Sequence, residues 1–250
     1  MAINIYEMMN SEILVKKIKG EGFAVIEEIF SDDEVKQLIA LIENADATNT
    51  TFRKTQDLFA IRQFLKEIPK AAHVIFNQKL NDLNIKLFGN DYFITKSIYF
   101  DKTEQSNWFV AYHQDLTISV DQKKDIQGFG PWTVKQNQFA VQPPLHFLEN
   151  NYTIRIHLDD TDEGNGALKV IPASHLKGIY RAETIDWTAE KEVFCNVKKG
   201  GVMIMKPLLL HASNRTTTNK KRRVIHIEFS NVILENQLNW AERQLIPSNI

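Results

Sequence analysis

Three side chains that could bind a transition metal stand out in the sequence, namely His113, Asp115 and His211. Two imidazoles and one carboxylate form the facial triad that holds non-haem Fe(II) and leaves coordination positions open for substrate and oxygen. Residues i and i+2 of an extended segment project to the same side, so we expect His113 and Asp115 to contact one ion together. The pattern indicates an oxygenase, although zinc would also accept this donor set.

Arg222 follows His211 in the sequence and could bind an anionic cosubstrate. A guanidinium is permanently charged and holds a carboxylate through two parallel hydrogen bonds, as the far end of a metal-chelating 2-oxo acid would require. We expect this arrangement if residues 224–229 form a strand antiparallel to the one that carries His211. The alternative is that residues 220–223 are only a solvated basic turn. The position of Arg222 after His211 favours the binding role.

Three sequence blocks carry a resemblance to a known family. They are Tyr112-His113-Gln114-Asp115-Leu116, residues 158–175 with Asn-Gly-Ala-Leu-Lys-Val-Ile-Pro-Ala-Ser-His at their end, and His211-Ala212-Ser213-Asn214 followed by Arg222-Arg223. With these blocks in this order, the chain from about residue 20 to about residue 232 resembles the phytanoyl-CoA dioxygenase family of Fe(II)- and 2-oxoglutarate-dependent oxygenases. The middle block is far more specific than the triad alone.

The resemblance implies a function for each residue that matches the family pattern. His113, Asp115 and His211 would bind Fe(II), and Arg222 would bind the distal carboxylate of 2-oxoglutarate together with Ser213. Related halogenases lack the metal-binding carboxylate, so the presence of Asp115 favours hydroxylation over chlorination. The resemblance therefore implies a dioxygenase that uses O2 and 2-oxoglutarate.

Three further polar residues are candidates for binding the cosubstrate or the substrate. Gln114 matches a family position beside the cosubstrate, which implies cofactor binding. Arg155 stands where many members have a tryptophan, so it could contact an anionic group of the substrate or form an ordinary surface ion pair. Lys102 could reach an anionic substrate as well, but a surface lysine is the default expectation.

Composition narrows the class of protein. The chain has 250 residues, of which 43% are hydrophobic, enough to bury the core of one large domain. The 30 basic and 31 acidic side chains nearly cancel, which argues against a nucleic-acid partner. The single cysteine, Cys195, is compatible with a reducing compartment. Because neither a signal peptide nor a membrane-spanning stretch is recognisable, we expect a cytoplasmic protein without a membrane partner.

Helices are expected mainly near the start of the chain. Residues 11–19 and 68–87 have helical patterns, and Pro69 is tolerable in the first turn of the second one. Residues 23–30 resemble a first strand. Ser31 and Glu34 have the spacing of a capping box, so a helix should follow through the apolar residues up to Ile42.

Strands are expected from residue 92 onward. Short β-rich segments cover residues 92–101, 111–115, 152–158, 167–172, 201–206 and 223–231. We predict a mainly β protein with flanking α-helices, in which a double-stranded β-helix (a cupin-like jelly-roll) forms the core. Residues 1–250 would be one domain, with helices of residues 1–90 packing on a core of residues 91–232.

Residues 117–151 separate the first two ligands from the next strand and are predicted to be a long active-site lid loop. Phe129 and Trp132 in this segment are candidates for lining the substrate pocket, although ordinary packing is the alternative for each. Two functions from different classes remain. One is a dioxygenase that hydroxylates a small molecule, and the other is a non-catalytic jelly-roll protein that binds a metal or ligand. The oligomeric state is open.

Overall fold

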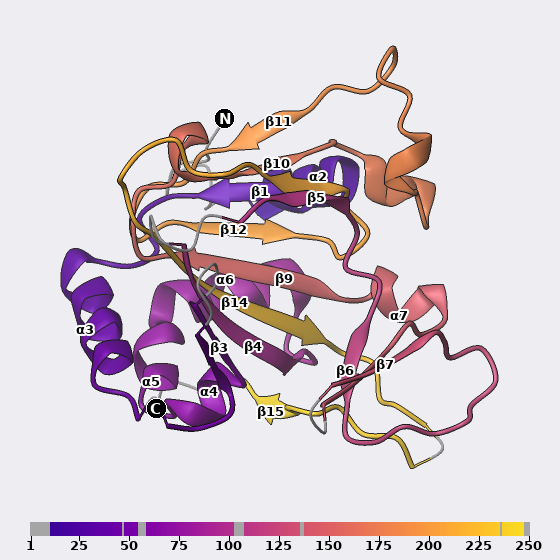
Figure 1. Ribbon diagram of the computed structural model, residues 1–250, viewed down its shortest axis with the longest axis horizontal. Helices are drawn as coiled ribbons and strands as arrows, with labels where there is room; N and C mark the ends of the chain where they lie inside the picture. The colour runs from indigo at the N-terminus through magenta and orange to yellow at the C-terminus, as the bar shows by residue number, and fades with distance from the viewer. Residues whose placement is uncertain are drawn as a thin grey trace.

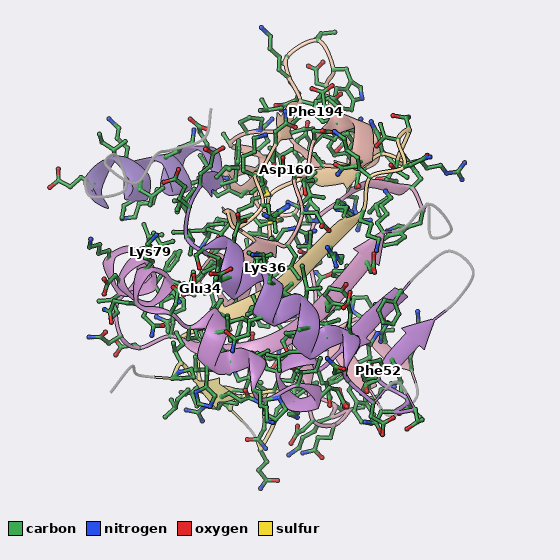
Figure 2. The ribbon with its side chains drawn as sticks, turned by 90° about the vertical axis from the view of Figure 1, so that its left-hand side faces the viewer. Glu34, Lys36, Phe52, Lys79, Asp160 and Phe194 are labelled. Carbon is green, nitrogen blue, oxygen red and sulfur yellow. The ribbon has the colours of Figure 1, made fainter. Side chains whose placement is uncertain are left out.

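The computed structural model describes residues 11–46, 48–54, 59–102, 108–135, 138–235 and 237–247. The chain starts with helix α2 (Ser11–Glu21), strand β1 (Phe23–Ile26) and helix α3 (Asp32–Glu43). The predicted capping box at the start of α3 is confirmed, because the Glu34 N–H donates to the Ser31 hydroxyl and the Ser31 N–H donates to the Glu34 carboxylate. Glu34 and Lys36 are labelled on α3 in Figure 2. The predicted strand over residues 23–30 ends at Ile26.

The single helix predicted for residues 68–87 is wrong. Two helices divide this range instead, α5 (Ala71–Ile75) and α6 (Gln78–Phe88), and the short helix α4 (Phe64–Glu67) precedes them. Asn77 starts α6, because its side-chain oxygen accepts from the Leu80 N–H at 2.9 Å while its amide nitrogen donates to the Ile29 carbonyl. Asn77 therefore caps the start of α6, and the predicted helix of residues 68–87 is interrupted before it.

An eight-stranded antiparallel sheet, here called the main sheet, is the largest element (Figure 1). Its order is β1, β12 (Val202–Met205), β9 (Tyr152–His157), β14 (Arg222–Ser230), β4 (Phe93–Lys102), β3 (Phe59–Arg62) and β2 (Phe52–Lys54), and β15 (Gln244–Leu245) also pairs with β4. Alternate residues such as Ile154, Ile225 and Ile227 are buried with the apolar residues of the helices α2 to α6. The helices thus cover one face of the main sheet, and the intervening strand residues point to the opposite face.

A four-stranded antiparallel sheet lies opposite that second face. It consists of β11 (Val193–Cys195), β10 (Leu168–Val170), β13 (His211–Ser213) and β5 (Val110–His113) in this order. Met203 and Met205 of the main sheet are buried with Val170 and Cys195 of this second sheet. Two facing antiparallel sheets with flanking helices confirm the predicted jelly-roll class of fold.

The segment predicted to be a long loop contains regular structure. Strands β6 (Ile118–Val120), β8 (Gln138–Val141) and β7 (Trp132–Lys135) form a small antiparallel sheet, seen at the right of Figure 1, and helix α7 (Leu145–Glu149) follows. Short 3₁₀ turns η1 (Glu163–Asn165), η2 (Ser174–Lys177) and η3 (Ala182–Thr184) complete the elements. None of the described helices has the length and apolarity needed to cross a membrane.

Candidate metal and cosubstrate site

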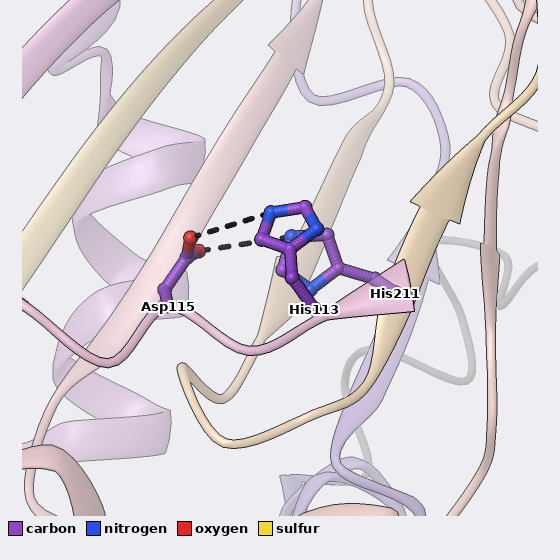
Figure 3. Close-up of side chains that lie close together, drawn as sticks. All are labelled: His113, Asp115 and His211. Atoms are coloured by element: carbon purple, nitrogen blue, oxygen red, sulfur yellow. Dashed lines mark ion pairs between the residues drawn. The ribbon is translucent and has the colours of Figure 1, made fainter. Parts of the chain in front are cut away.

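The structure brings His113, Asp115 and His211 together at one end of the second sheet (Figure 3). His113 ends β5 and is the cross-strand partner of His211, which begins β13. Asp115 lies just beyond β5, where its N–H donates to the Pro207 carbonyl. Each histidine Nε2 lies 3.9 Å from a different carboxylate oxygen of Asp115. Three potential ligand atoms therefore surround one point, as the spacing in the sequence predicts.

Backbone hydrogen bonds fix the tautomers of both histidines. The Nδ1 of His113 lies 2.9 Å from the Ala111 carbonyl, and the Nδ1 of His211 lies 2.9 Å from the Leu209 carbonyl. A carbonyl only accepts, so each Nδ1 carries a proton, and in a neutral imidazole the Nε2 lone pair then faces Asp115. A metal-binding histidine is usually held in this way by a hydrogen bond from its other ring nitrogen. The donor set fits a divalent transition metal.

The charges of the site also suit a metal. Burial alone would raise the pKa of Asp115, but positive charge from His211, His226 and Lys96 lowers it to about 2. Burial lowers the pKa of His211 to about 4. At neutral pH the carboxylate is therefore ionised and His211 is neutral, which are the protonation states that metal binding requires.

Arg222 approaches the site from the main sheet. The condition that its strand pairs with the His211 strand is not met, because β14 pairs with β4 and β9. Arg222 and Arg223 nevertheless differ in their partners. Arg223 forms a two-point ion pair with Asp159, at 2.7 and 2.9 Å. Arg222 is buried, and its Nε has no hydrogen-bond partner among the described residues. A buried guanidinium without a carboxylate partner indicates that an anion binds there.

Ser213 and Gln114 have different surroundings. Ser213 is buried on β13, and its hydroxyl donates to the Gly166 carbonyl at 2.9 Å. The Gln114 amide donates to the carbonyls of Gly178 and Leu208, and its oxygen accepts from the Tyr180 N–H. No N–H of Gln114 is left for a cosubstrate carboxylate. Cofactor binding by Gln114 stays a prediction.

A chain of hydrogen-bonded side chains runs across the main sheet from Arg155. Arg155 Nη1 donates to His226 Nδ1 at 3.1 Å, His226 Nε2 donates to Glu228 at 3.1 Å, and Lys96 donates to the same carboxylate at 2.7 Å. Arg155 is therefore an interior residue, and the surface-pair alternative is excluded. Sequence reasoning missed His226 and Glu228, although both follow Arg222 at the even spacing that places residues on one strand face.

Lys102, on the same face of the main sheet, also differs from its expected position. Its side chain is fully buried, so the expectation of a surface lysine is wrong. The residue is the cross-strand partner of Arg222, and both cations lie over the ring of Trp108, with Lys102 Nζ 5.3 Å and the Arg222 guanidinium carbon 6.0 Å from its centroid. Burial, with added repulsion from Arg222 and Arg215, lowers the pKa of Lys102 to about 7.

The two predicted aromatic lining residues pack elsewhere. Phe129 and Trp132 belong to an apolar cluster with Phe147 and Trp240. Neither lines the cavity of about 450 Å³ between the small sheet and the main sheet. The lining of this cavity is mostly polar and includes Arg62, Lys96, Thr117, Ser119, Thr133, Gln138, Ala140 and Glu242. Substrate binding by the two aromatics stays a prediction.

The other histidines of the site region have structural partners. His157 Nδ1 lies 2.8 Å from the Thr161 hydroxyl, and His175 Nε2 donates to the Lys19 carbonyl at 3.1 Å. Within the described part of the chain, the triad is the only group of three or more such residues that could hold a metal.

The jelly-roll and its two-histidine, one-carboxylate site define the class of non-haem iron oxygenases. The family model of phytanoyl-CoA dioxygenase matches residues 18–224, so the chain belongs to the phytanoyl-CoA dioxygenase family. The protein is an oxygenase by this family match, and its two-histidine, one-carboxylate site fits iron. A comparison with curated protein sequences gave no significant match.

Solved structures share the fold at low sequence identity. EctD from S. alaskensis, with 2-oxoglutarate and 5-hydroxyectoine, is 22% identical over 87% of this chain and 75% of its own, with a TM-score of 0.66. The epimerase SnoN, in complex with Fe³⁺, alpha ketoglutarate and nogalamycin RO, is 12% identical over 89% and 84%, with a TM-score of 0.66. AviO1 from Streptomyces viridochromogenes Tue57 is 16% identical over 88% and 94%, with a TM-score of 0.63.

Proposed function

We propose that this protein hydroxylates a small molecule, R–H + O2 + 2-oxoglutarate giving R–OH + succinate + CO2. The observation that carries the proposal is the convergence of His113, Asp115 and His211, with both histidines held in the tautomer that presents Nε2. The single cysteine supports a reducing, cytoplasmic location as part of the same proposal.

In this proposal the triad holds Fe(II) through the two Nε2 atoms and the Asp115 carboxylate. Bound iron and 2-oxoglutarate would supply the redox chemistry that activates dioxygen against a C–H bond. The protein contributes position and environment. The carbonyls of Ala111 and Leu209 orient the two imidazoles, and the low pKa of Asp115 keeps its carboxylate charged throughout the physiological range.

Arg222 and Ser213 bind the distal carboxylate of 2-oxoglutarate in this proposal. Arg222 lacks a carboxylate partner among the described residues, and burial lowers its pKa to about 9. A buried anion would therefore be strongly favoured beside it. Arg155 lies within electrostatic reach of both Asp115 and Arg222. We retain Arg155 as a predicted contact for an anionic group.

The prime substrate occupies the polar cavity in this proposal. Thr117, which lines the cavity, follows Asp115 by two residues, and Lys96, which also lines it, is close enough for its charge to lower the pKa of Asp115. A volume of about 450 Å³ suits a small molecule. Residues 117–151 supply much of the lining, which supports the predicted lid role of this segment.

The test is an anaerobic titration of the Fe(II)-loaded protein with 2-oxoglutarate, followed by the visible charge-transfer absorption of the chelated 2-oxo acid. We expect no band in His211→Ala. Arg222→Ala should need about ten- to hundredfold more cosubstrate, because a charge-assisted hydrogen bond is lost. Lys221→Ala, which removes an exposed charge beside Arg222, is the matched control and should behave like the wild type.

A wild-type protein that binds iron but gives no band would contradict the proposal and favour the non-catalytic metal or ligand binder. Measuring the metal content after expression separates iron from zinc. Succinate release across a panel of small molecules then identifies the substrate.

A further inference from the structure

Lys102 is a buried lysine to which the proposed roles of the triad and Arg222 give no function. It is fully buried, and among the described residues it donates a hydrogen bond to a neutral group, the Asn214 carbonyl. Lys96, on the same face of β4, has the carboxylate of Glu228 at 2.7 Å. A buried ammonium is costly unless it is paired, so Lys102 differs from an ordinary interior lysine.

Lys102 and Ser213 lie together next to Gly166. Gly166 has a φ of +84°, and a Cβ added to it would lie 2.9 Å from Lys102 Nζ, 2.9 Å from the Asn214 carbonyl oxygen and 3.4 Å from the Ser213 hydroxyl oxygen. A side chain at residue 166 would therefore clash with Lys102, and the glycine lets Lys102 Nζ and the Ser213 hydroxyl lie close to the same point. Lys102 donates one N–H to Asn214, so two of its three donors have no hydrogen-bond acceptor among the described residues.

Arg222 faces the same region from the neighbouring strand. Arg222 and Lys102 are directly opposed in the β14–β4 ladder, so their side chains leave the sheet on the same side. Both cations contact the Trp108 ring. Two like charges that are held together in the interior repel each other, and one carboxylate between them would reverse the sign of that interaction.

We propose that Lys102 is a positioning residue that binds the distal carboxylate of 2-oxoglutarate together with Arg222 and Ser213, and that it selects a 2-oxo dicarboxylate over a 2-oxo monocarboxylate. The inference rests on the proposed function and adds a second cation to its cosubstrate site. Burial lowers the pKa of Lys102 to about 7, as expected for a lysine that lacks its anion.

The test compares two 2-oxo acids that chelate iron alike but differ at the far end. The Fe(II)-loaded protein is titrated anaerobically with 2-oxoglutarate and with pyruvate, both by the charge-transfer band and by calorimetry. In Lys102→Met we expect about ten- to hundredfold weaker binding of 2-oxoglutarate and less than about twofold change for pyruvate. Lys102→Arg, which keeps the charge, should recover most of the affinity. Lys221→Met is the exposed-lysine control.

Equal losses for the two ligands would show a merely structural role, and no loss for either would also overturn the inference. Lys102→Gln keeps a donor for the Asn214 carbonyl, so it provides a second neutral variant if Lys102→Met fails to fold. A wild-type protein that binds neither 2-oxo acid would contradict the proposed function itself. A wild type that prefers 2-oxoglutarate, with a preference unchanged in the neutral variants, would contradict only the inference about Lys102.

Discussion

At the scale of single residues, the protonation of Lys102 should make cosubstrate binding depend on pH. Its pKa is lowered to about 7, and the charged groups that act on it are Arg222 and Arg215, both repulsive. A bound carboxylate would raise that pKa, because an opposite charge favours the ammonium form. Binding must then take up a proton wherever Lys102 is neutral in the free protein.

We therefore expect the affinity for 2-oxoglutarate to be constant below the pKa of free Lys102 and to fall as the pH rises above about 7, by up to about tenfold per pH unit. Arg222 stays charged at neutral pH, although burial lowers its pKa to about 9. The ratio of the 2-oxoglutarate affinity to the pyruvate affinity reports the contribution of the distal carboxylate, because pyruvate lacks that group. A ratio that is flat from pH 6 to 9 in the wild type, or equally steep in Lys102→Arg, would contradict this expectation.

At the scale of elements, the small sheet forms one wall of the proposed substrate cavity. Thr133 and Lys135 of β7 line the cavity, whereas Val134, between them, does not line it and is 50% exposed. Replacing Ala140 of β8 with tryptophan should fill part of the cavity and leave the triad intact. With a substrate identified by succinate release, we expect Ala140→Trp to lose at least about tenfold in substrate-stimulated turnover, while the charge-transfer band is retained. Val134→Trp on the same sheet is the control, and equal losses in both variants would argue against this cavity.

Elements also show what the sequence could predict. The capping box of α3 depends on a spacing within a few residues, and the triad depends on residue types that few other functions use. Both were therefore predictable. The break before α6 depends on Asn77, whose side chain bonds the Ile29 carbonyl across the fold, so a helical pattern alone did not reveal it. The strand that carries Arg222 pairs with β4 and β9 and not with the His211 strand, and the sequence could not settle this because strand pairing between distant segments is not encoded in their spacing. Lys102 was misjudged for the same reason, since only its partner strand shows that it is buried.

At the scale of the whole molecule, the C-terminal segment closes back on the main sheet. Gln244 of β15 pairs with Ile94 of β4, and the Lys66 side chain donates to the Ala241 carbonyl. Glu242 in this segment is buried, and its carboxylate accepts from both the N–H and the hydroxyl of Ser97. Burial raises the pKa of Glu242 from 4.5 to about 7, despite these hydrogen bonds.

The raised pKa means that the folded state binds a proton at Glu242 more tightly than the unfolded state does. Its contribution to stability is fully present below about pH 4.5, is lost as the pH rises, and is absent above about pH 7. Glu242→Gln is neutral and keeps an acceptor for Ser97, so its free energy of unfolding should exceed that of the wild type by about 3 kcal/mol at pH 8 and by little at pH 4.5. Denaturant unfolding between these pH values checks this, with Glu235→Gln at an exposed position as the control. A difference that does not change with pH would mean that Glu242 stays ionised, and that the C-terminal segment docks on the main sheet with its charge in place.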